Sequence, residues 1–356
     1  MRYIGVIILL VLCLTLLLLT GCIVNPVIPE TAIGNLGNQE NTEEPVIENT
    51  EEPVIENTEE PAKWSGLGMG LFSTANTSVF DGYVDDLLAN GFNELRMNTD
   101  WYNWNTKTVD QFEIISAITK GAYIIWGVES GGRTLTSSNW DDYADAVLDA
   151  AQWAQDNGVY EFQIGNEEEY HIDGTTMTIA QIITNLKSVA TDVQAVFTRG
   201  NVSYTCGQLN IYDWVSAGKG DLDILASNIY RVTAVERPWM DYIDSLVATF
   251  GPTGTAITEF GPDANGLDYW STDEAVQTTA VTEMIEYIKA SGITRAFYFC
   301  YRDPSWLSGF GARKDDGTYR LLWNQALLNT GPVESTTVPI KTTTISLPDT
   351  IALIPK

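Results

Sequence analysis

From residue 63 to about residue 330, short apolar runs alternate with longer segments in which apolar residues recur every three or four positions. The short runs predict buried strands, and the longer periodic segments predict amphipathic helices. Eight strands are predicted, at 67–73, 94–98, 122–128, 161–165, 202–205, 224–229, 255–260 and 295–300. Eight helices are predicted between and after them, at 79–89, 109–119, 140–156, 178–197, 211–217, 238–250, 272–290 and 321–328.

The strict alternation of strands and helices over residues 63–330 defines the fold class. Parallel strands that helices cover read as continuous apolar runs, as residues 123–126 and 297–299 do. Eight strand–helix units in about 265 residues predict an α/β fold of the TIM-barrel type, a (β/α)8 barrel. A doubly wound open sheet is the alternative, but no glycine-rich phosphate loop follows the first predicted strand.

The N-terminal segment has the pattern of a secretory leader. Arg2 precedes a nearly unbroken apolar run of about 16 residues, which Leu19-Thr20-Gly21-Cys22 closes. That run is short for a membrane span of roughly 20 residues. The closing residues resemble the lipobox of prokaryotic lipoproteins, which implies that 1–22 is a lipoprotein signal peptide and that Cys22 carries the lipid. An uncleaved signal anchor is the alternative, and both place the body outside the cytoplasm, at the cell surface or in the periplasm, attached to a membrane.

Two flanking segments lack the composition of a core. Residues 23–62 contain an eight-residue repeat, Glu-Asn-Thr-Glu-Glu-Pro-Val-Ile, at 40–47, at 48–55 and in part at 56–61. Its glutamates repel one another and its prolines oppose regular structure, so a disordered, extended linker is expected. Residues 331–356 are rich in threonine and proline without a helical period. They form either a tail or one or two strands against the barrel.

Charge and metal-ligand content exclude several classes of function. The net charge is −28, which argues against nucleic acid and anionic lipid as partners. His171 is the single histidine and no zinc-like cysteine spacing occurs, so neither a metal nor an organic cofactor is expected. Cys206 and Cys300 fall in or beside strands that are not neighbours in the predicted barrel, which favours free buried thiols over a disulfide. The body is expected to be a monomer.

Two predicted strands end at a glutamate. The run at 161–165 leads to Asn166-Glu167, and the run at 255–260 contains Glu259 near its end. The carboxyl ends of the strands form the active face of a (β/α)8 barrel. A pair of carboxyl groups there is what glycosidic-bond hydrolysis requires, with one group protonating the leaving oxygen and the other attacking the anomeric carbon.

Asn-Glu at the fourth strand and Glu at the seventh resemble the clan of retaining (β/α)8 glycosidases that includes many cellulases, mannanases and β-1,3-glucanases. The resemblance implies that Glu167 is the acid/base, that Glu259 is the nucleophile and that Asn166 binds the sugar hydroxyl beside the anomeric carbon. In such a site apolar walls and the charge of Glu259 would raise the pKa of Glu167. Retention requires the two carboxyl groups to lie about 5 Å apart.

Further strand ends match the clan in part. Arg96 on the second strand corresponds to an arginine beside the nucleophile, where its charge favours the ionised carboxylate. Tyr230 after the sixth strand corresponds to a tyrosine that hydrogen-bonds the nucleophile. Asn228 occupies a position where many members carry histidine, and it too is expected to bind the substrate. Many members also end the eighth strand with tryptophan, whereas this chain continues with Tyr301 and has Trp306 further on.

Aromatic residues collect in the segments predicted to follow the strands on the active face. Flat rings stack on the apolar faces of sugars. The tryptophans expected to contact a glycan in this way are Trp101, Trp126, Trp270 and Trp306. His171 is also expected to contact the glycan.

The sequence therefore predicts a membrane-tethered retaining glycoside hydrolase that acts on the β-glycosidic bonds of a polysaccharide or oligosaccharide. One alternative is a surface lipoprotein that binds glycans without catalysis, and another is a transglycosylase that remodels envelope glycans with the same pair of carboxylates. A third interpretation is that the acidic run at 167–169 binds a calcium ion.

Overall fold

The computed structural model describes residues 66–330, apart from residue 75 and the segments 231–238, 262–273 and 305–308. Within this part of the chain, eight parallel strands close into a barrel in sequence order. The strands are β1 (Gly66–Gly70), β2 (Glu94–Asp100), β3 (Tyr123–Glu129), β4 (Glu161–Asn166), β5 (Asn201–Gly207), β6 (Ile224–Ile229), β7 (Thr255–Phe260) and β8 (Arg295–Tyr298).

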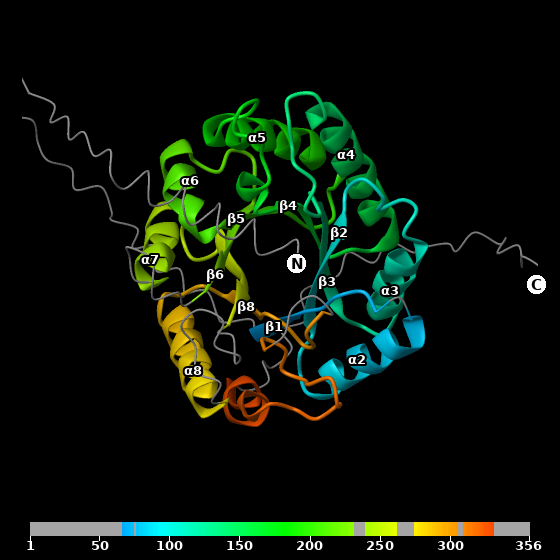
Figure 1. Cartoon of the computed structure of the whole chain (residues 1–356), viewed down its shortest axis with the longest axis vertical. Coiled ribbons are helices and arrows are strands. Elements are labelled where there is room, and N and C mark those ends of the chain that lie inside the picture. Colours follow the sequence, from blue (N-terminus) through cyan, green and yellow to red (C-terminus); the bar gives the residue numbers. More distant parts are fainter. Residues whose placement is uncertain (1–65, 75, 231–238, 262–273, 305–308, 331–356) are drawn as a thin grey trace, which may run out of the picture. The chain divides into compact units, whose positions relative to one another are not determined.

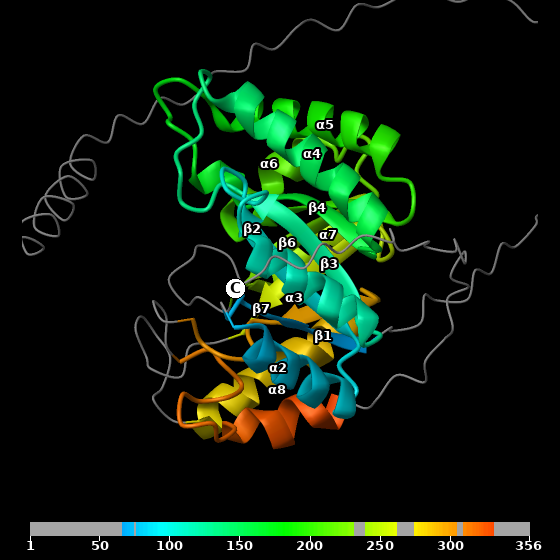
Figure 2. The same cartoon turned by 90° about the vertical axis from the view of Figure 1, so that its right-hand side faces the viewer.

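Helices surround the strands (Figure 1), and Figure 2 shows the same arrangement from the side. They are α2 (Thr77–Ala89), α3 (Thr108–Thr119), α4 (Trp140–Asn157), α5 (Ile179–Val196), α6 (Ile211–Ala217), α7 (Trp239–Phe250) and α8 (Glu274–Ala290). This arrangement confirms the predicted (β/α)8 fold and rules out the open sheet.

The helical position after β8 differs from the prediction. The segment expected to be an α-helix at 321–328 winds mainly as a π-helix over Trp323–Leu327 and ends in a 3-10 turn at Leu328–Thr330. The Trp323 ring stacks on Tyr319, with centroids 4.7 Å apart, and on Phe92, at 5.2 Å. Helical periodicity in a sequence indicates the buried side of such a segment but does not distinguish an α-turn from a wider π-turn.

A close approach between β3 and β4 depends on glycine. A Cβ atom placed on Gly127 would lie 1.9 Å from the carbonyl oxygen of Gln163, so no other residue fits without moving a strand. Gln163 is buried at this point, and its side chain contacts Arg96 in the site described below.

The amino ends of three strands are joined by a buried ion cluster. Arg295, the first residue of β8, pairs with Glu94 at the start of β2 at 2.9 Å and with Glu161 at the start of β4. Because the strands are parallel, this cluster lies at the opposite end of the barrel from residues that close the strands.

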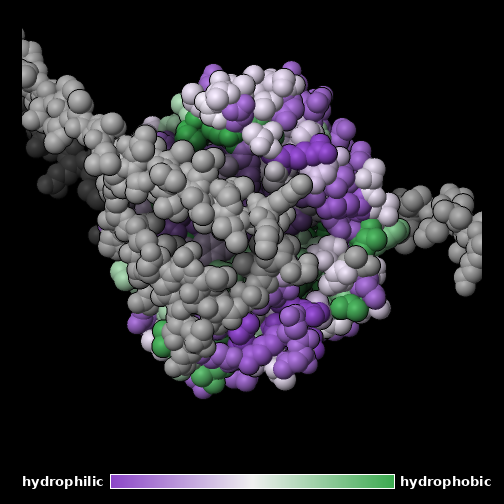
Figure 3. Space-filling model, in the orientation of Figure 1, coloured by the Kyte–Doolittle hydropathy of each residue, from purple (hydrophilic) through white to green (hydrophobic). Residues whose placement is uncertain are grey.

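Several sequence predictions lie outside the described residues. These are the leader at 1–22 with Cys22, the linker at 23–62, the tail at 331–356, and Trp270 and Trp306. Among the residues that the structure describes, no helix has the length and apolar character needed to span a membrane. In Figure 3, hydrophilic side chains predominate over the described part of the visible face, and hydrophobic ones are scattered.

Candidate active site

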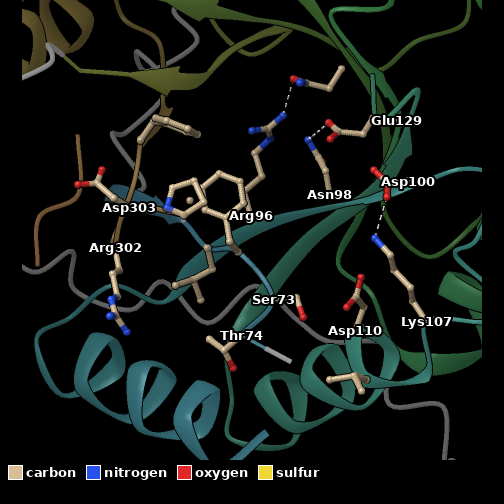
Figure 4. Close-up of a pocket in the computed structure, with 18 of the residues that line it drawn as sticks. Ser73, Thr74, Arg96, Asn98, Asp100, Lys107, Asp110, Glu129, Arg302 and Asp303 are labelled. Carbon is tan, nitrogen blue, oxygen red and sulfur yellow. Dashed lines mark hydrogen bonds and ion pairs between the residues drawn. The ribbon is translucent and has the colours of Figure 1, made fainter. Parts of the chain in front are cut away.

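A cleft of about 1360 Å³ opens where the strands end. Its lining comes from five strands, β1, β2, β3, β4 and β7, from the segments that follow β1, β2, β3, β4 and β8, and from α2 and α3. Both predicted catalytic glutamates, Glu167 and Glu259, line it, together with Arg96, Asn166 and His171. Folding therefore brings residues that are far apart in the chain to one hollow (Figure 4).

Glu259 has both carboxylate oxygens engaged. Nη1 of Arg96, on β2, donates to Oε1 at 2.7 Å, and the ion pair is largely buried. The Tyr230 hydroxyl donates to Oε2. A charge-assisted hydrogen bond on each oxygen fixes the orientation of the carboxylate and compensates its charge. Arg96 and Tyr230 thus lie where the resemblance implies.

The Arg96 guanidinium also bonds two side chains of β4, which lies beyond β3 in the barrel. Its Nε donates to Oε1 of Gln163 at 2.9 Å, and Nη2 donates to Oδ1 of Asn166 at 2.7 Å. The amide of Asn228 donates to the same Asn166 oxygen at 3.1 Å. With its oxygen occupied twice, Asn166 has its NH₂ group as the donor toward the cleft.

Asn228 does not line the cleft itself. It is buried beneath Asn166, and its own oxygen accepts from the Thr258 hydroxyl at 3.1 Å. The prediction that Asn228 contacts substrate is therefore wrong, because its inward position on β6 points it at Asn166. Its contribution is to hold the Asn166 side chain in place.

Glu167 is in an environment suited to a proton donor. Burial raises its pKa to about 8, and the nearby negative charge of Glu259 acts in the same direction, while Asn228 and Arg96 oppose the shift. A carboxyl group of this kind keeps its proton at neutral pH. The expected cause of the shift, enclosure together with the second carboxylate, is confirmed.

Substitution of Arg96 by lysine tests the fork geometry of this network. Lysine keeps the charge but cannot bond Glu259, Gln163 and Asn166 at once. We expect Arg96→Lys to lower kcat by about 100-fold, because misplacement of reacting groups has costs of that order. Steady-state kinetics with circular dichroism as a folding check measures this. Wild-type kcat in the folded variant would show that the network is dispensable.

Two predicted aromatic contacts are wrong. Trp126 is 1% exposed, donates from Nε1 to the Thr99 hydroxyl at 3.1 Å and packs against Trp153 of α4. Trp101 is 8% exposed and packs against Tyr143. Alternate strand residues face opposite sides, so Trp126 turns toward the helices. The aromatic residues that do line the cleft among the described ones are Phe72, Tyr83 and Phe299.

Glu129 is a site residue that the sequence interpretation passed over. It lines the cleft at the end of β3, and its Oε2 accepts from the Asn98 amide at 2.9 Å (Figure 4). Burial raises its pKa to about 7, and Glu259 adds to the shift while Arg96 opposes it. The two-residue strand period was the available signal, because Glu129 and Trp126 must face opposite sides of β3.

Ion pairs fix other parts of the cleft wall. Lys107 pairs with Asp100 at 2.8 Å, and Arg302 pairs with Asp315 at 3.3 Å. Asp303 accepts hydrogen bonds from three consecutive backbone N–H groups at residues 309–311. These contacts give the wall a defined shape on the sides of β2 and β8.

The acidic run at 167–169 does not form a cation site. Over the described ranges, no group of three or more histidine, cysteine, aspartate or glutamate side chains is arranged to hold a metal ion. Glu168 and Glu169 instead point into the protein, where N–H and hydroxyl groups donate to them. Cys206 and Cys300 are both free and buried, as expected.

Three carboxyl groups with raised pKa values make stability depend on pH. Burial raises the pKa of Glu129 to about 7 and those of Glu167 and Glu168 to about 8. The folded state therefore binds more protons than the unfolded chain between about pH 4.5 and pH 8, and stability falls as pH rises through that window. We expect the free energy of unfolding to be larger at pH 5 than at pH 8, and each of the three groups contributes to this difference in the same direction.

Urea denaturation at the two pH values measures this difference. Glu129→Gln, which cannot ionise, should show a smaller difference than the wild type. Equal stability at both pH values, or greater stability at pH 8, would contradict the assigned pKa directions.

Several solved structures that resemble this chain are glycoside hydrolases. An endocellulase from Pyrococcus horikoshii in complex with cellotetraose aligns with a TM-score of 0.56 and 12% identity, over 75% of this chain and 92% of its own. An exo-β-1,4-mannosidase from Opitutaceae bacterium strain TAV5 aligns with a TM-score of 0.60 and 12% identity, over 73% of this chain and 58% of its own. A family 5 xyloglucanase from Paenibacillus pabuli aligns with a TM-score of 0.54 and 14% identity, over 75% and 97%.

Comparison at the level of sequence gives no match, either to a family model or to a curated protein. At identities of 12–14% the structural likeness establishes the shared barrel. Activity has to be argued from the side chains in the cleft, because one barrel fold supports many chemistries.

Proposed function

We propose that this protein is a retaining glycoside hydrolase that cleaves β-glycosidic bonds by a two-glutamate double displacement. The observation that carries the proposal is the contrast between two carboxyl groups in one cleft. Glu259 is bound by Arg96 and Tyr230, whereas the pKa of Glu167 is raised to about 8 by burial and by Glu259. A buried proton donor beside a carboxylate that two donors hold in place is what the acid and nucleophile roles require.

In the first step, a carboxylate oxygen of Glu259 attacks the anomeric carbon and the glycosidic C–O bond breaks. The leaving oxygen takes the proton of Glu167, which gives a covalent glycosyl ester and an ionised Glu167. In the second step, Glu167 removes a proton from water, the water oxygen attacks the anomeric carbon, and Glu259 is released. The NH₂ group of Asn166 donates to the adjacent sugar hydroxyl in both transition states.

The size of the cleft supports a chain-like substrate. A volume of about 1360 Å³ exceeds the roughly 300–1,000 Å³ that is usual for small-molecule sites. Phe72, Tyr83 and Phe299 offer apolar surface beside the polar groups, as binding of pyranose rings requires. We infer that several sugar units of a polysaccharide or oligosaccharide occupy the cleft. The aligned endocellulase, for comparison, was solved in complex with cellotetraose.

We also propose that the enzyme is tethered outside the cytoplasm. Support comes from the sequence, in which a leader ends at Cys22 and an acidic, proline-containing repeat separates that cysteine from the barrel. Metabolic labelling with a fatty acid analogue tests the anchor, since incorporation should be lost in Cys22→Ala.

Activity on a panel of β-glucans, mannans, xylans and galactans tests the proposed reaction. Cleavage with a first-formed product of retained anomeric configuration, read by proton NMR, is the expected result. Products longer than the substrate in the presence of acceptor sugars would identify a transglycosylase. Binding without any cleavage would identify a glycan-binding protein.

A further inference from the structure

The backbone of the proposed general acid is in an unfavourable conformation. Among the described residues, Glu167 alone combines a side chain larger than that of glycine with a positive φ, at φ 57° and ψ 34°. This left-handed conformation costs an ordinary residue roughly 1–2 kcal/mol. Such a conformation persists only where the surroundings enforce it.

The neighbouring side chain of Glu168 provides the enforcing contacts. Its Oε1 accepts from the backbone N–H of Ser130 at 3.0 Å and from that of Asn166 at 3.2 Å. The same oxygen lies 3.2 Å from the Tyr143 hydroxyl, which donates to the carbonyl oxygen of Ile164 at 2.7 Å. Ser130 directly follows β3, Asn166 ends β4 and Tyr143 belongs to α4. One carboxyl group therefore joins the end of β4 to the residue that follows β3, and it lies against Tyr143 of α4.

Glu168 is not positioned to touch a substrate. Its exposed fraction is 0%, and it is absent from the residues that line the cleft. Its Oε2 is buried without a hydrogen-bond partner, as is the hydroxyl of Ser130. Burial raises its pKa to about 8, with the charge of Glu129 adding to the shift, so the group is mainly a neutral acid at pH 7.

A second tie acts on the backbone of the same segment. The backbone N–H of Glu168 donates to the Tyr204 hydroxyl at 2.9 Å, and that hydroxyl donates to Oε2 of Glu169 at 2.8 Å. The Glu169 carboxylate also accepts from Nε1 of Trp214. The turn after Glu167 is thereby bound to β5 and α6 as well as to β3 and α4.

We propose that Glu168 is a positioning residue, whose buried carboxyl group holds Glu167 in the left-handed conformation that presents the Glu167 carboxyl group to the cleft. The inference rests on the proposed function, because the role served is that of a general acid. It goes beyond that function because it assigns a role to a further glutamate, Glu168, that does not contact the sugar. That role is to position the carboxyl group of Glu167, which carries the proton.

The first test compares Glu168→Gln with Glu168→Leu. Glutamine keeps an acceptor oxygen for Ser130 and Asn166 and resembles the protonated acid, so kcat should stay within about fivefold of the wild type. Leucine removes every acceptor, so kcat should fall by about 100-fold with KM within about threefold, as for a misplaced catalytic group. Equal loss in both variants, or no loss in Glu168→Leu, would overturn the proposal.

Glu113→Leu is the matched control. Glu113 is equally buried and also has one carboxylate oxygen without a partner, but it bonds Thr74 in the segment after β1. This variant should lose stability in a thermal melt without the selective fall in kcat. A fall in kcat equal to that of Glu168→Leu would mean that any buried carboxylate has this effect.

A crystal structure of Glu168→Leu shows the backbone conformation of residue 167 independently of activity. Residue 167 should leave the positive-φ region in the variant and keep it in Glu168→Gln, and retention of φ near its wild-type value in Glu168→Leu would overturn the proposal. If Glu168→Leu does not fold, Glu168→Asp, which is one methylene too short to reach both backbone N–H donors, serves for both readouts. A wild-type protein without activity on any glycan would refute the proposed function, while the structures would still decide the role of Glu168.

Discussion

Glu259→Gln is expected to lower kcat on a β-linked glycan by about 10,000-fold or more while leaving the fold intact, as the loss of a covalent nucleophile does in other enzymes. The amide keeps the shape of the side chain and can still bond Arg96 and Tyr230, but its oxygen is too weak a nucleophile to form the glycosyl ester. Steady-state assays at high enzyme concentration measure the residual rate.

Glu161→Gln is the matched control for that variant. Glu161 is also a buried glutamate paired with an arginine, Arg295, but it lies at the amino ends of the strands. Loss of its charge should lower the melting temperature and leave kcat within a few-fold of the wild type. Near-wild-type turnover in Glu259→Gln would remove Glu259 from the mechanism.

Glu167→Gln is expected to show a loss that depends on the leaving group. General acid catalysis contributes about 10²–10⁴-fold, so kcat/KM on a glycan should fall by about 1,000-fold. A dinitrophenyl glycoside releases a stable phenolate that needs no proton, so kcat/KM for that substrate should fall by less than about tenfold.

The pH profile gives the second readout for Glu167. Burial and Glu259 raise its pKa to about 8, so the protonated form is lost as pH rises through that value and wild-type kcat/KM should decline above it. In Glu167→Gln this alkaline decline should be absent, whereas Glu113→Gln should keep it. A uniform loss on both substrates with an unchanged profile would assign the proton donor to another residue.

Much of the barrel could be predicted because its signals are local. Continuous apolar runs specify buried parallel strands, and glycines after helical segments mark where helices end. The order of the elements then placed Glu167 and Glu259 at one face, since every parallel strand ends there. Arg96 was predicted from the resemblance to the glycosidase clan, and all three residues lie in the cleft.

The remaining site residues could not be predicted, because the type of a residue does not show which way its side chain points. Trp126 looked like a sugar platform because tryptophan often is one, yet its position in β3 turns it toward α4. Glu129 is three residues away on the opposite side and lines the cleft. The roles of Asn228 and Glu168 arise from contacts across strands, to Asn166 and to Ser130, that are distant in the sequence.

The segment at 321–328 shows a different limit of prediction from sequence. Its apolar period predicted a buried helix, and residues 323, 326 and 327 are buried. Within the wider π-turn, the Trp323 ring stacks on Tyr319 and on Phe92, and Phe92 lies far from it in the sequence. Trp270 and Trp306 remain predictions for glycan contact.

The most direct measurement is the site of covalent labelling by a 2-deoxy-2-fluoro glycoside with a good leaving group, mapped by peptide mass spectrometry. The fluorine slows hydrolysis of the ester, so a retaining enzyme accumulates the glycosyl adduct on its nucleophile. We predict one sugar on Glu259 and none in Glu259→Gln. An adduct on another residue, or steady turnover of the unfluorinated substrate with inverted product and no adduct, would contradict the double displacement.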